Sequence, residues 1–168
     1  LNINPQNASL NNNLGNIYFE MGNKEKALSF FKKAVQIDNS FTDAHFNLSL
    51  LLRNIGYIDE ALKHLNIIIK IKPDDIRAHI NSAIILQTKG EYKRSIQSFE
   101  NALKIEPNNP TAVNLFVELI KSLKLVNVKE DNLKFIKNIF LFLLKKNNIN
   151  HNDIFNNAKL VLFFKEEQ

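Results

Sequence analysis

A repeat of 34 residues constrains the fold of this 168-residue chain more than any other feature. Gly22, Gly56 and Gly90 are separated by 34 residues at each step, and Pro73 and Pro107 keep the same spacing. Three further series share the period: Ala27, Ala61 and Ser95; Phe31, Leu65 and Phe99; and Ile3, Ile37, Ile71, Ile105 and Ile139. A fixed period of about 20 to 50 residues is typical of stacked structural repeats, so we expect an elongated array.

Each period contains the pattern of two helices. In the first period, apolar residues at three- and four-residue spacing indicate a first helix, which Gly22 ends. A second apolar stripe, which includes Ala27 and Phe31, follows directly. Pro73 and Pro107 end later second helices, because proline lacks the amide donor and clashes with the preceding turn. The pattern predicts helices at 8–21, 24–37, 42–55, 58–71, 76–89, 92–105 and 110–124.

The residue types at these positions resemble the tetratricopeptide repeat (TPR). The resemblance is carried by Leu14, Gly15, Tyr18, Ala27, Phe31, Ala34, Pro73 and Pro107. It implies an all-α fold, a right-handed TPR superhelix (α-solenoid) of antiparallel helix pairs. Full repeats are expected at 8–41, 42–75 and 76–109, with 1–7 as the tail of a preceding repeat. Because the chain begins at Leu1 rather than at a methionine, we expect it to be a segment of a longer protein.

Small residues mark the contact between the two helices of each repeat. The expected contacts join Gly15 to Ala27, Ser49 to Ala61 and Ala83 to Ser95. An aromatic residue is common near the start of the first TPR helix, where this chain has Asn11, His45 and His79. We interpret the two histidines as packing residues that replace this aromatic. The alternative is that they stack as a pair of metal ligands.

The repeat pattern decays after residue 109. Pro110 begins one more first helix, but Lys124 and Lys129 occupy the places of the small contact residues. A large charged residue cannot sit where two helix backbones touch, so 110–168 is expected to be a divergent ending. We expect further helices at about 129–146 and to about 165, which form a helical C-terminal cap or link the array to a missing domain.

Composition and motifs argue against catalysis. The chain has no Cys and only 4 Gly, none of them in a phosphate-binding loop, and its 4 His lack the spacing of a metal site. We therefore expect no catalytic residue, no metal and no cofactor. The net charge of +5 is spread over both halves, which argues against nucleic acid, and no apolar run is long enough for membrane insertion. No targeting signal is visible, and we expect a cytoplasmic location.

A binding surface is expected on the first helices, because the TPR resemblance implies that they line a concave groove that holds peptides. The candidate residues are Asn12, Asn13, Asn16, Phe19, Phe46, Asn47, Leu50, Arg53, Arg77, Ile80, Asn81, Ile84 and Gln87. Asn13, Asn47 and Asn81 recur every 34 residues, and a row of amides can hold the backbone of an extended peptide. In this respect the chain resembles the TPR region of O-linked N-acetylglucosamine transferases, where an asparagine ladder holds substrate chains.

Two alternatives apply to this surface. Asn accounts for 26 of the 168 residues, so the ladder can also reflect composition alone. The resemblance also suggests the carboxylate clamp of TPR cochaperones, whose places here hold Asn12, Asn16, Asn47, Arg77 and Asn81. Two of the three cations of the clamp are missing, which disfavours this mode. The apolar candidates are expected to form a solvent-facing floor beside the ladder. They are Phe46, Leu50, Ile80 and Ile84.

The sequence therefore predicts a non-catalytic protein-protein interaction scaffold that binds a peptide or protein segment in the groove. One alternative is the substrate-presenting TPR region of a larger enzyme, a glycosyltransferase or a methyltransferase, whose catalytic domain is absent. Another is a self-association module that forms a homo-oligomer. The expected partner is a protein or peptide, with no nucleic acid.

Overall fold

Helices make up the part of the chain that the computed structural model describes, residues 7–122. They are α1 (Ala8–Glu20), α2 (Lys24–Ile37), α3 (Thr42–Asn54), α4 (Ile58–Ile71), α5 (Ile76–Thr88), α6 (Tyr92–Ile105) and α7 (Pro110–Ser122). Each begins at the residue that the repeat pattern predicts, and residues 7–122 contain no strand. The expected helices at about 129–146 and beyond lie outside the described residues, as does most of the tail at 1–7.

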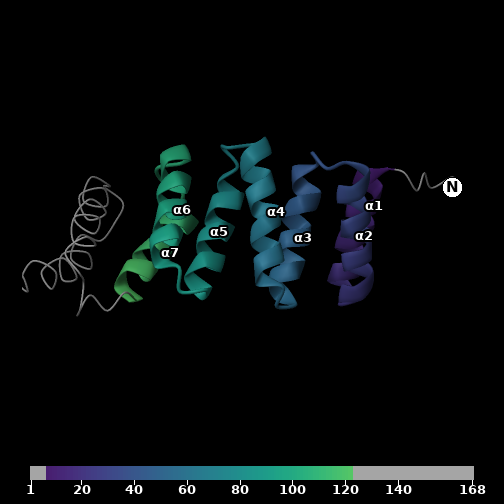
Figure 1. Cartoon of the computed structure of the whole chain (residues 1–168), viewed down its shortest axis with the longest axis horizontal. Coiled ribbons are helices and arrows are strands. Elements are labelled where there is room, and N and C mark those ends of the chain that lie inside the picture. Colours follow the sequence, from purple (N-terminus) through teal and green to yellow (C-terminus); the bar gives the residue numbers. More distant parts are fainter. Residues whose placement is uncertain (1–6, 123–168) are drawn as a thin grey trace, which may run out of the picture. The chain divides into compact units, whose positions relative to one another are not determined.

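The chain divides into two compact units, Leu1–Glu106 and Pro107–Gln168. In the first unit, α1 packs most extensively with α2, α3 with α4, and α5 with α6 (Figure 1). Successive pairs meet through α2 with α3 and through α4 with α5. This arrangement is an α-solenoid of helix pairs, as the sequence predicts. In the second unit the described part is α7, whose first turn is capped where Asn109 Oδ1 accepts from the Ala112 amide at 3.0 Å.

A glycine in the left-handed region ends the first helix of each pair. Gly22, Gly56 and Gly90 have φ of 76°, 89° and 75°, which residues with a Cβ rarely adopt. In the first pair, the Asn23 amide donates to Tyr18 O at 2.8 Å and the Gly22 amide donates to the carbonyl three residues earlier. This is the Schellman motif, which satisfies the last carbonyls of the helix and turns the chain into the second helix.

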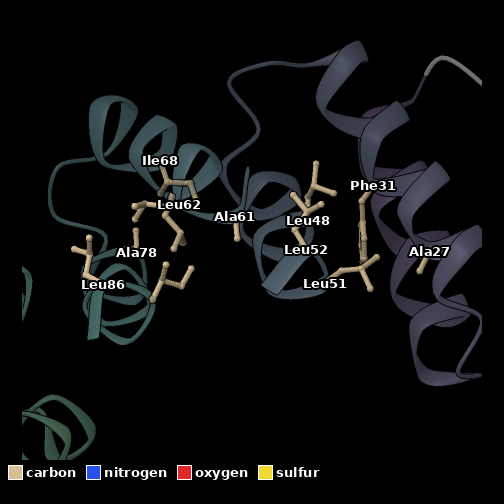
Figure 2. Packing of buried hydrophobic residues seen from close by; sticks show 12 residues of the cluster. Ala27, Phe31, Leu48, Leu51, Leu52, Ala61, Leu62, Ile68, Ala78 and Leu86 are labelled. Carbon is tan, nitrogen blue, oxygen red and sulfur yellow. The ribbon is translucent and has the colours of Figure 1, made fainter. Parts of the chain in front are cut away.

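The core of the first unit lies between successive helix pairs. Figure 2 shows the Phe31 ring of α2 beside Leu48 and Leu51 of α3. The cluster comprises Ala27, Phe31, Leu48, Leu51, Leu52, Ala61, Leu62, Leu65, Ile68, Ala78, Ile85 and Leu86. Because each large side chain fills space against the next pair, a repeat depends on its neighbours for its buried surface.

Ile17 on α1 differs in burial from its equivalents in the next two repeats. It is 51% exposed, whereas its repeat equivalents Leu51 and Ile85 are each 1% exposed. Leu51 lies beside Phe31 of the preceding helix pair (Figure 2), and Ile85 belongs to the same buried cluster. Among the described residues, no helix pair precedes α1, so the same position is open to solvent there.

Ser82 provides a test of packing in the third repeat. It occupies the repeat position of Leu14 and Leu48, is buried, and its hydroxyl has no hydrogen-bond partner among residues 7–122. We expect Ser82→Ala to raise the free energy of unfolding by about 1 kcal/mol in urea titration, because it removes an unsatisfied buried hydroxyl. Ser95→Ala is the matched control and should lower it by about 1 kcal/mol, because Ser95 Oγ donates to Ala83 O at 2.7 Å. A less stable Ser82→Ala variant would contradict this account.

Candidate functional site

The candidate residues all lie on the first helices of the three pairs. Together they form a surface that we call the first-helix face. Helix α1 contributes Asn12, Asn13, Asn16 and Phe19; α3 contributes Phe46, Asn47, Leu50 and Arg53; and α5 contributes Arg77, Ile80, Asn81, Ile84 and Gln87. All three helices belong to the first unit of the chain.

Side-chain hydrogen bonds join neighbouring first helices across this face. Asn47 Nδ2 of α3 donates to Asn12 Oδ1 of α1 at 2.9 Å. Arg53 Nη1 of α3 donates to Asn81 Oδ1 of α5 at 3.1 Å. Both bonds are partly shielded from solvent, and they hold the polar side chains of the three helices in one register.

Arg77 is the most heavily paired cation of the face. Its Nη2 lies 2.9 Å from Asp43 Oδ1 on α3 and 2.8 Å from Asp75 Oδ2, and its guanidinium stacks over the Phe46 ring with 4.8 Å to the centroid. Burial raises the pKa of Asp75, but the hydrogen bond and the charge of Arg77 outweigh it, so the pKa is lowered. Both anions therefore neutralise Arg77 within the chain.

Asp75 has two roles at the start of α5. It is the N-cap of this helix, and its Oδ1 accepts from the amides of Arg77 and Ala78 at 3.1 and 3.3 Å. Its second role, as a buried counter-ion of Arg77, was missed. The sequence signal for this second role is an arginine two positions after a capping carboxylate, in the first turn of the helix.

The three asparagines of the expected ladder have different surroundings. Asn13 is exposed, and its side chain makes no hydrogen bond with residues 7–122. Asn47 is half-buried and donates to Asn12, while its own Oδ1 accepts no bond from the described chain. The Asn81 amide is occupied on both sides, because Oδ1 accepts from Arg53 and Nδ2 donates to Arg77 O at 2.9 Å.

The expectation of a fully solvent-facing apolar floor is wrong at Ile80, which is only 8% exposed. Phe46, Leu50 and Ile84 are half-buried. Asn12, at the same repeat position as Ile80, is buried as well and points to the next first helix through its bond with Asn47. Asn12 and Ile80 are therefore shielded from solvent, whereas Phe46, Leu50 and Ile84 remain partly accessible.

The two repeat-related histidines act as packing residues with a polar anchor. His45 and His79 are both buried, and each Nε2 bonds the backbone carbonyl six residues earlier, at 3.0 and 2.8 Å. His45 does not pair with His79. Its Nδ1 lies 2.9 Å from Nδ1 of His64 on α4, a partner that no sequence signal indicated. Residues 7–122 contain no group of three His, Cys, Asp or Glu that could hold a metal ion.

The His45–His64 contact has a defined polarity. Because Nε2 of His45 donates to the Asn39 carbonyl, its neutral ring accepts at Nδ1, so His64 donates from Nδ1. Burial lowers the pKa of His64 to about 4, and the adjacent His45 ring contributes to the same shift. His64 therefore favours its neutral form in the folded protein.

The fold and this face define a helical-repeat protein built from pairs of antiparallel helices. Family models described as tetratricopeptide repeat match residues 8–41, 42–75 and 76–109. The chain belongs to the tetratricopeptide repeat family. A search of curated proteins gives no match. Within the described residues, no helix has both the length and the apolarity that a membrane crossing requires.

Solved TPR structures resemble the chain in fold. The first TPR of Spaghetti (RPAP3), bound to the HSP90 peptide SRMEEVD, aligns with TM-score 0.66 and 19% identity over 73% of this chain and 98% of its own. MamA aligns with TM-score 0.67 and 18% identity over 98% of this chain and 81% of its own. YrrB, a TPR protein with an unusual peptide-binding site, aligns with TM-score 0.62 and 24% identity over 65% of this chain and 56% of its own.

Proposed function

We propose that this chain is a non-catalytic interaction scaffold that binds an extended peptide or protein segment on its first-helix face. The observation that carries the proposal is the alternation of half-buried apolar side chains with amides on neighbouring helices. Leu50 and Ile84 offer apolar contact, and Asn47 of α3, which donates to Asn12 of α1, keeps an open acceptor. TPR domains are protein-interaction modules, and the similar structures of Spaghetti and YrrB concern peptide binding.

The amides suit a ligand backbone more than a particular side chain. Asn47 Oδ1 can accept from a peptide amide, and the exposed Asn13 can both donate and accept. An extended segment presents such groups along its length, so two amides on adjacent helices can fix its direction and register. The half-buried apolar side chains then supply contact area that does not depend on the register of the hydrogen bonds.

The paired state of Arg77 argues against a clamp for a chain-terminal carboxylate. Asp43 and Asp75 already neutralise this arginine, and the other places of the clamp hold asparagines. A bound carboxylate would have to displace an existing ion pair while losing its own hydration. We therefore propose that the face binds an internal segment of its partner.

Replacement of Asn47 and Asn81 by alanine tests this proposal. We expect the double variant to bind peptides, selected on the wild-type chain from a random display library, at least about tenfold more weakly by fluorescence anisotropy. Its helical circular dichroism should persist, with a loss of roughly 1 kcal/mol of stability for each interhelix hydrogen bond.

The matched control is Asn66→Ala with Asn101→Ala, because these asparagines lie on the second helices α4 and α6. This variant should bind the selected peptides as the wild type does. Equal binding by the Asn47/Asn81 variant, or equal loss in both variants, would place the peptide elsewhere on the chain.

A further inference from the structure

We infer that the first-helix face selects peptide segments in which an acidic side chain, bound by Arg53, stands near an aliphatic side chain that packs on Leu50 and Ile84. This inference rests on the proposed function and adds to it the chemistry of the partner. The structure supports it in three ways: the pairing of the arginines, the geometry of the Arg53 guanidinium and the apolar residues beside it.

Arg53 differs from the other arginines of the chain in its ion pairs. The sequence contains three arginines, and all of them lie within the described residues. Arg77 pairs with Asp43 and Asp75, and Arg94 pairs with Glu91. Arg53 is half-buried, and no carboxylate of residues 7–122 lies within ion-pair distance of it. The first-helix face therefore carries one partly desolvated positive charge that a ligand can neutralise.

The hydrogen bond to Asn81 leaves the Nε–Nη2 edge of the Arg53 guanidinium open to a ligand. Arg53 donates to Asn81 Oδ1 through Nη1, whereas Nε and Nη2 bond no residue of the described chain. Nε and Nη2 form the side edge of a guanidinium, which matches the two oxygens of a carboxylate. The Asn81 amide cannot flip freely, because its Nδ2 donates to Arg77 O. Asn81 thus holds the guanidinium in one orientation before a ligand arrives, which reduces the entropy cost of binding.

The surroundings of this edge specify the second part of the ligand. Leu50 lies three residues before Arg53 on α3, and Ile84 lies three residues after Asn81 on α5, so each shares a helix face with its polar neighbour. Both aliphatic side chains are half-buried. A single arginine beside aliphatic surface fits one Asp or Glu with a neighbouring Leu, Ile or Val. It does not supply the several cations that a terminal carboxylate or a phosphate requires.

Selection from a random peptide display library on the full chain, followed by anisotropy measurements with synthetic peptides, tests the inference. The variants are Arg53→Gln, which removes the charge, and Arg53→Lys, which keeps it without the bidentate edge. Arg94→Gln on α6 is the matched control. Wild type and Arg94→Gln should enrich peptides with Asp or Glu close to an aliphatic residue. Arg53→Gln should bind such peptides at least about tenfold more weakly, and Arg53→Lys should fall between them.

The acidic residue of each peptide is then replaced by Gln. We expect the Gln-substituted peptide to bind wild type and Arg53→Gln with equal affinity, because neither complex then contains an ion pair between Arg53 and a peptide carboxylate. An acidic preference that persists in Arg53→Gln would overturn the inference. Peptides that depend on Asn47 but show no acidic preference would also overturn it while leaving the proposed function intact. A library that yields no binding peptide would overturn both.

Discussion

Gly15→Val is expected to lower the free energy of unfolding by about 3 kcal/mol, because no space exists for a larger side chain where α1 meets α2. A Cβ at Gly15 would lie 2.5 Å from Cδ1 and Cε1 of Phe31 and 3.0 Å from its Cγ. The Phe31 ring is 2% exposed and belongs to the core between the first and second helix pairs. It cannot move away without disturbing that core. The measurement is urea unfolding followed by circular dichroism, with the loss read from the midpoint.

The repeats themselves supply the compensating change. The equivalent pair in the second repeat is Ser49 with Leu65, both buried, so a side chain with a Cβ is compatible with a leucine in the ring position. We expect Gly15→Val with Phe31→Leu to be more stable than the sum of the single changes predicts, by about 1 kcal/mol or more. Additive losses would show that the contact between the two residues does not cause the effect.

The helix boundaries could be predicted because they depend on local chemistry. Gly22, Gly56 and Gly90 are needed for the left-handed residue after each first helix, and this requirement is visible in one sequence. Asn7, Asn23 and Asn109 cap helices with their side chains, which accounts for part of the high Asn content. These asparagines are therefore explained by local structure, without a role on the first-helix face.

The first-helix face could be predicted only as a surface. The repeat phase placed its residues on the correct helices, and Asp43 with Arg77 even keeps the 34-residue spacing. Contacts that break the repeat spacing were not predictable, as with Arg53 and Asn81, because they depend on how far two helices slide past each other. The burial of Ile80 was missed for a similar reason. A periodic pattern gives the direction of a side chain to within a broad arc, and a small rotation of the helix decides its exposure.

Acidification from neutral pH toward pH 4 is expected to destabilise the protein through the His45–His64 pair. Burial and the adjacent His45 ring lower the pKa of His64 from about 6.5 to about 4 in the folded protein. Below about pH 6.5 the unfolded chain therefore binds a proton at His64 that the folded chain does not bind until the pH approaches 4. The stability linked to this neutral ring is complete above that pH and declines toward pH 4. Because the ring is half-buried, we expect a loss of about 1 to 2 kcal/mol across this window.

His64→Asn should flatten this part of the pH profile, because Asn keeps an N–H donor toward His45 and does not titrate. Urea unfolding at several pH values between about 7.5 and 4.5 measures the difference from wild type, and the carboxylates that both proteins share cancel in the comparison.

The third repeat offers the reverse experiment. Its equivalent of His45 is His79, and its equivalent of His64 is the half-buried Ser98. Ser98→His would place a second imidazole beside a buried histidine, as in the second repeat. This variant should lose more stability than wild type between about pH 6.5 and pH 4, because the added imidazole would also be buried in its neutral form. If His64→Asn retains the wild-type slope, or Ser98→His leaves it unchanged, paired burial of histidines does not control the acid response of this solenoid.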